Sequence, residues 1–96
     1  EPTAGLDLGA RETLVSALDE IIAGKRSPQV VLVTHQIEEI PTGITHCAVM
    51  RGGAMIAQGP IADTLTGVVL SEAFSLPLLA GMTGGRWWAR AASAQD

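Results

Sequence analysis

Three side chains in the first part of the chain have the chemistry needed to act on a phosphate. Glu1 and Asp7 lie in the run Glu-Pro-Thr-Ala-Gly-Leu-Asp, and His35 follows the apolar stretch 29–34. A carboxylate can orient or deprotonate a water molecule, and an imidazole can donate a hydrogen bond to a phosphate oxygen near neutral pH. If Glu1 and His35 follow neighbouring parallel strands, they would flank one bound phosphate, because ligands bind beyond the carboxyl ends of such strands.

The elements that would position these residues are a helix and a strand. Residues 8–23 are predicted to form an amphipathic helix, with Asp7 as its N-cap and Gly24 just past its end. The stretch 29–34 is apolar and rich in valine without alternation, which predicts a strand covered on both faces in a parallel sheet. A helix followed by such a strand is half of a βαβ unit, so a further apolar strand is expected just before Glu1.

Shorter elements are predicted for the rest of the chain. Residues 36–40 should form a short helix that ends at Pro41, with Glu38 and Glu39 on a solvated face. Glycine-rich turns between short apolar runs predict two β-hairpins, and two short helices should lie between them. The expected ranges are 45–50 and 54–58 for the first hairpin, 61–65 and 69–74 for the helices, and 76–82 and 86–91 for the second hairpin.

The opening run resembles the junction of Walker B and D-loop in ABC-type ATPases, where an Asp is followed by Glu-Pro-Thr-x-x-Leu-Asp. The resemblance implies that Glu1 is the catalytic glutamate and that Asp7 lies beside the bound nucleotide. It also implies ATP and Mg²⁺ as cofactors, with the Mg²⁺-associated Asp expected one position before Glu1 and no metal ligand within this chain. By the same resemblance, the D-loop of this chain would lie at a dimer interface and consist of Ala4, Gly5, Leu6 and Asp7.

A second segment resembles the H-loop of the same family. Val33-Thr34-His35-Gln36 is followed by Glu38-Glu39-Ile40, and in the family this histidine contacts the γ-phosphate. The two motifs occur in the family's order and are separated by one helix and one strand. Residues 52–61 also resemble a stretch of importer-type ATPases, and residues from about 60 to 96 resemble the tail of ATPases of iron-complex and related metal uptake systems.

The resemblance therefore implies an α/β fold: the C-terminal part of a P-loop NTPase domain, with a parallel-sheet strand plus helices followed by a β-hairpin and short helices. One partial ABC ATPase nucleotide-binding domain would cover residues 1–96. The chain starts in mid-motif without a methionine, so we expect it to be a fragment. It contains neither a Walker A sequence nor the Leu-Ser-Gly-Gly-Gln signature, so we expect the 96 residues alone to be inactive.

The function implied is that of the ATP-hydrolysing subunit of an ABC importer. Its partners would be a second ATPase subunit and transmembrane permease subunits, and it would lie in the cytoplasm at the inner face of the membrane. Two alternatives remain open at this point. One is a non-transport ABC-type ATPase acting in translation or DNA repair, and the other is a truncated module without catalytic activity.

The remaining candidate residues favour plain structural roles. The net charge of −4 and the absence of a basic cluster argue against a nucleic-acid partner. Cys47 is the only cysteine, so no internal disulfide can form, and we interpret it as a buried, inert thiol. His46 is predicted to pack or lie on the surface, with Cys47 on the opposite face of the strand. Trp87 and Trp88 are adjacent on a predicted strand, so one should be buried and the other exposed.

Overall fold

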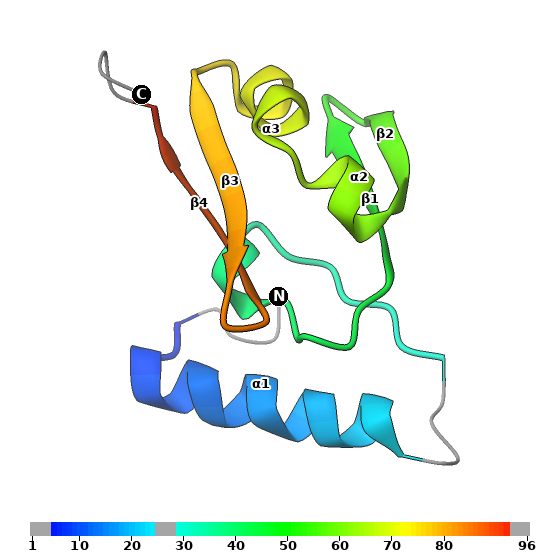
Figure 1. Ribbon diagram of the computed structural model, residues 1–96, viewed down its shortest axis with the longest axis vertical. Helices are drawn as coiled ribbons and strands as arrows, with labels where there is room; N and C mark the ends of the chain where they lie inside the picture. Colours follow the sequence, from blue (N-terminus) through cyan, green and yellow to red (C-terminus); the bar gives the residue numbers. More distant parts are fainter. Residues whose placement is uncertain (1–4, 25–28, 93–96) are drawn as a thin grey trace. The chain divides into compact units, whose positions relative to one another are not determined.

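The computed structural model describes residues 5–24 and 29–92, which fall into two compact units divided between Ile44 and Thr45. The first unit contains α1 (Leu8–Ala23) and the short 3₁₀ helix η1 (Ile37–Glu39). The second contains two antiparallel hairpins and two short helices (Figure 1). In the described ranges, no helix combines the length and the apolarity needed to cross a bilayer.

Helix α1 begins and ends where the sequence predicts. The Asp7 carboxylate accepts a hydrogen bond from the backbone N–H of Ala10 at 2.8 Å, which satisfies one of the free donors of the first turn. Gly24 follows the last turn with φ −65°, so the helix ends without a left-handed residue. On the apolar face Val15 is only 2 % exposed, whereas Ile21 is 49 % exposed. The predicted apolar stripe is therefore covered unevenly, with Leu14, Leu18 and Ile22 half-buried.

The predicted parallel strand is not formed. Residues 29–34 belong to neither of the two sheets that the described residues make, and both of those sheets are antiparallel. Val31 and Val33 are 83 % and 71 % exposed. A strand requires a hydrogen-bonded neighbour, and the described part of the chain supplies none for this segment. The sequence pattern of a doubly covered strand is present, but the described residues form no parallel sheet that this segment could join.

The first hairpin pairs β1 (His46–Arg51) with β2 (Ala54–Pro60), as the sequence predicts. Gly52 and Gly53 form its turn with φ +56° and +79°, two positive angles that favour glycine at both positions. His46 is exposed and its Nδ1 lies 2.9 Å from the Thr45 hydroxyl, while Cys47 is half-buried on the opposite face. The predicted alternation of His46 and Cys47 is therefore confirmed.

The two short helices are α2 (Ile61–Thr64) and α3 (Gly67–Phe74), close to the predicted ranges. Helix α3 begins at a Thr66 cap, whose hydroxyl accepts from the Val69 N–H at 3.2 Å. It packs against β1 and against β3 of the second hairpin. The well-buried apolar residues of α2 and α3 and the loop between them are Ile61, Leu65 and Leu70.

The second hairpin pairs β3 (Leu78–Thr83) with β4 (Arg86–Ala91) around Gly84 and Gly85, again as predicted. Trp87 is buried as predicted for one of the pair, whereas Trp88 is half-buried and not exposed. Trp88 covers Gly81 on the facing strand so closely that a Cβ at position 81 would lie 2.5 Å from its ring. Glycine at position 81 is therefore required for this indole to lie against the strand.

Burial raises the pKa of the Cys47 thiol above its ordinary value of 9.0, and a hydrogen bond with Thr64 offsets part of that rise. The neutral thiol is thus favoured in the folded state. The stability that the neutral Cys47 thiol contributes is present below the ordinary thiol pKa, and it is lost as the pH rises through the raised pKa of the folded state.

We expect iodoacetamide to alkylate Cys47 more slowly than a cysteine in an unstructured peptide near pH 8, and the rate to increase above pH 9. Equal rates near pH 8 would contradict this, and Cys47→Ala provides the blank.

Candidate functional site

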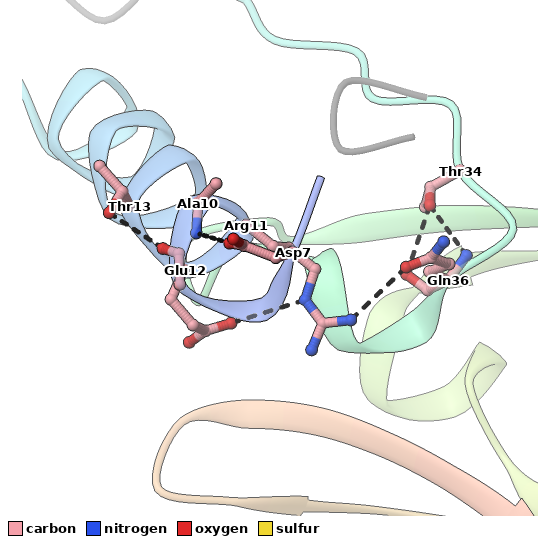
Figure 2. A network of polar contacts seen from close by, with 8 residues as sticks. Asp7, Ala10, Arg11, Glu12, Thr13, Thr34 and Gln36 are labelled. Carbon is pink, nitrogen blue, oxygen red and sulfur yellow. Dashed lines mark hydrogen bonds and ion pairs between the residues drawn. The ribbon is translucent and has the colours of Figure 1, made fainter. Parts of the chain in front are cut away.

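The turn that carries His35 is fixed by the residue before it. The Thr34 hydroxyl accepts a hydrogen bond from the Gln36 N–H at 2.9 Å and donates to the Gln36 carbonyl at 3.3 Å (Figure 2). Such side-chain turns are a local property of threonine, which can bond the backbone two residues further on. The result is a closed turn with His35 at its bend and exposed.

Arg11 joins this turn to the beginning of α1. Its Nη1 donates to the Gln36 side-chain oxygen at 3.5 Å, and its Nε lies 3.8 Å from a Glu12 carboxylate oxygen. Figure 2 shows Arg11 reaching from the first turn of the helix, next to the Asp7 cap, toward Gln36. Both distances are long, so the contact positions the two segments more than it stabilises them. The helix that follows the predicted D-loop and the predicted H-loop are therefore neighbours.

A second contact with α1 holds the segment that follows η1. The Asp19 carboxylate accepts from the backbone N–H groups of Thr42 at 3.2 Å and Gly43 at 3.0 Å. A Cβ at Gly43 would lie 2.6 Å from the Ile22 side chain, so this close approach requires glycine. The segment from Thr34 to Gly43 is thus attached to α1 at two points about two helical turns apart.

The structure describes only part of the predicted site. Glu1 and Ala4 lie outside the described residues, so their placement relative to His35 stays a prediction. Gly5 has φ +79°, Leu6 is 47 % exposed and Asp7 caps α1. Within the described ranges, no three His, Cys, Asp or Glu side chains are grouped as a metal site.

Near His35 the predicted exposure of Glu39 is wrong, and the contacts of three residues were missed. Glu39 was expected on a solvated face, but it is 1 % exposed, because the 3₁₀ turn buries this position while Glu38 stays half-buried. The contacts of Arg11, Gln36 and Asp19 were not predicted. Each of these contacts joins residues more than twenty positions apart, and the local sequence does not indicate which distant residue each side chain will contact.

Comparison with known proteins identifies the family. No family model matches the chain. A putative ABC transporter ATP-binding protein of Streptococcus mutans is 38 % identical over 78 residues, which cover 81 % of this chain and 30 % of that protein. The chain belongs to the ABC transporter ATP-binding proteins, and it spans about 30 % of the length of this relative.

Two further relatives differ in the direction of transport that their names state. The molybdenum import ATP-binding protein ModC of Shewanella sp. (strain MR-7) is 38 % identical over 61 residues, covering 64 % of this chain and 17 % of ModC. The Nod factor export ATP-binding protein I of Neorhizobium galegae is 37 % identical over 60 residues, covering 62 % of this chain and 17 % of that protein. The relatives therefore include both an importer and an exporter.

Proposed function

We propose that the chain is part of the ATP-hydrolysing subunit of an ABC transporter and supplies its catalytic base and its γ-phosphate sensor. The observation that carries this proposal is the similarity of four-fifths of the chain to an ABC transporter ATP-binding protein. The two motifs around Glu1 and His35 occur in the same chain, in the order that this family uses.

The proposed reaction is hydrolysis of the terminal phosphoanhydride bond. The oxygen of a water molecule attacks the γ-phosphorus, the bond to the oxygen that bridges the β- and γ-phosphorus breaks, and ADP leaves with that oxygen. Glu1 orients the water and accepts its proton. The His35 imidazole donates a hydrogen bond to a γ-phosphate oxygen and so stabilises the negative charge on that oxygen in the transition state. Asp7 and the rest of the D-loop, residues 4–7, lie at the interface with a second ATPase subunit.

The local structure supports a sensor role for His35. The hydrogen bonds between Thr34 and Gln36 limit the conformations of the backbone on both sides of the histidine. Arg11 then links this turn to the helix whose N-cap is Asp7. A backbone held in this way loses little conformational entropy when the histidine contacts a phosphate, so more of the interaction energy remains for binding.

ATP and Mg²⁺ would be held largely by other parts of the full-length protein. The 96 residues contain no Walker A sequence to bind the β- and γ-phosphates and no signature motif. We therefore propose that residues 1–96 act only within a complete nucleotide-binding domain, with residues 33–36 as its H-loop. Residues from about 60 to 96 would form its C-terminal tail.

The test of this function is ATP hydrolysis by the full-length protein. Purified with its permease in lipid vesicles, it should release phosphate from ATP when Mg²⁺ is present, and the isolated 96-residue chain should not. Absence of turnover by the full-length complex would contradict the proposal. Turnover by the 96-residue chain alone would contradict the assignment of ATP binding to other segments.

We further propose import as the direction of transport, with the subunit at the cytoplasmic face of the membrane against permease subunits. The support is the resemblance of residues 52–61, in the turn and second strand of the first hairpin, to importer-type ATPases. Because relatives of both directions match, the direction must be measured. ATP supplied to the cytoplasmic side should drive solute from the opposite side toward it, and net movement the other way would contradict import.

Arg11→Met tests the link between α1 and the His35 turn. Methionine keeps much of the length of the arginine side chain but cannot donate to Gln36, so His35 should be held less firmly. We expect kcat of the full-length protein to fall by roughly 2–10-fold, with a smaller change in KM for ATP. Glu12→Gln is the matched control, because it removes the exposed ion pair with Arg11 and leaves Gln36 in place. An equal loss in both variants would contradict a positioning role.

A further inference from the structure

Glu39 is the most deeply buried charged residue of the described chain. It lies in η1 and its side chain is 1 % exposed. Both of its carboxylate oxygens are buried, and neither has a hydrogen-bond partner. Its backbone N–H donates to the Gln36 carbonyl at 3.2 Å, whereas its side chain makes no hydrogen bond.

A carboxylate in this state is costly, because burial removes its hydration and nothing replaces it. Native proteins pair nearly all such groups with a cation or with hydrogen-bond donors. The described arginine of the first unit is Arg11, whose Nη1 donates to Gln36 and whose Nε lies 3.8 Å from Glu12 without forming a hydrogen bond, and neither Glu39 oxygen has Arg11 as a partner. The carboxylate of Glu39 therefore indicates a donor that the described residues do not provide.

The geometry of the unsatisfied atoms restricts the donor. Two oxygens of one carboxylate lie unpaired together, which suits the two parallel N–H groups of a guanidinium better than the single charge of an ammonium. The chain itself has ten acidic and only six basic residues. The relative from Streptococcus mutans is matched over only 30 % of its length, so a full-length protein of that size would contain a large number of further residues.

We propose that Glu39 forms a buried, bidentate ion pair with an arginine of the same polypeptide that lies outside these 96 residues. The pair would attach the segment after the H-loop to the rest of the ATPase domain. This inference rests on the proposal that the chain is part of a longer domain. It does not depend on catalysis by Glu1 or His35.

The test is the thermal stability of full-length variants. Glu39→Gln keeps the shape of the side chain and removes its charge, which would leave the arginine buried and unpaired. We expect its Tm to fall by roughly 5–10 °C. Glu20→Gln, at an exposed position of α1, is the control and should leave Tm nearly unchanged. Stability equal to or above that of the unaltered protein in Glu39→Gln would overturn the proposal.

The partner is then identified by a scan of arginines. Each arginine of the full-length protein is replaced by glutamine, alone and together with Glu39→Gln. Replacement of the paired arginine alone should lower Tm by about as much as Glu39→Gln does. In the double variant it should add little to the loss that Glu39→Gln causes. Replacement of that arginine by lysine should restore only part of the loss. Coupling of Glu39 to one of the six basic residues of this chain would overturn the assignment to an outside segment.

A structural measurement covers the case in which Glu39→Gln fails to fold. A crystal structure of the unaltered full-length protein should place an arginine guanidinium against both Glu39 oxygens. A carboxylate facing water, a backbone amide or apolar side chains would overturn the pair. Because none of these measurements reads ATP hydrolysis, an inactive full-length protein would contradict the proposed function and leave this result unaffected.

Discussion

Glu1→Gln in the full-length protein is expected to reduce kcat for ATP hydrolysis by roughly 10²–10⁴-fold, the usual contribution of a positioned general base. Glutamine has nearly the same shape as glutamate, but it cannot accept the proton of the attacking water. ATP binding should be retained, because the phosphates are held by other groups. The measurement is phosphate release under single-turnover conditions, together with the amount of ATP that stays bound to the variant.

Glu20→Gln is the matched control for this change, since it removes one carboxylate at an exposed position of α1. It should leave kcat unaltered. Unchanged hydrolysis in Glu1→Gln would mean that the carboxylate is not the base, and it would favour a module without a catalytic role. Loss of ATP binding together with hydrolysis would instead point to a role in holding the nucleotide.

His35→Ala should lower kcat by roughly 10²–10³-fold, because it removes a hydrogen-bond donor aimed at the developing charge on the γ-phosphate. The Thr34 turn does not use the imidazole, so the backbone at this position should keep its conformation. Single-turnover rates report the loss of the chemical step. Unfolding curves of the same variant, close to those of the unaltered protein, would show that the fold is intact.

The exposed His46 on β1 provides a control for His35, since His46→Ala removes an imidazole far from the predicted motif in the sequence. It should retain full activity. Equal effects of the two substitutions would contradict a sensor role for His35. The double variant of Glu1 and His35 should lose much less than the product of the two single losses, because groups that act in one step are not additive.

Local chemistry made much of the fold predictable. Helix α1 begins at an aspartate that can cap it, and its bounds follow from that cap and from the spacing of its leucines and isoleucines. Both hairpins turn at glycine pairs whose positive φ angles favour glycine. The motifs around Glu1 and His35 were recognised from residue type and order alone, and the family to which they point was confirmed by the relatives.

The segment 29–34 shows that the local sequence alone does not determine whether a strand forms. Its valines predict a covered parallel strand, yet Val31 is 83 % exposed and the described residues contain no parallel ladder. A strand is a property of two segments, since its hydrogen bonds and its covered faces come from elsewhere in the chain. Sequence within the segment determines that it can become a strand. It cannot supply the neighbour.

The sequence by itself thus determined the helix, the two turns and the residues that could do chemistry, because each depends on groups only a few positions apart. Tertiary structure alone decided that Arg11 reaches Gln36, that Asp19 holds the Gly43 backbone and that Glu39 is buried. These contacts join residues brought together by folding, and no pattern within a short window records which of them will meet. The burial of the Glu39 carboxylate without a hydrogen-bond partner is likewise seen only in the folded structure.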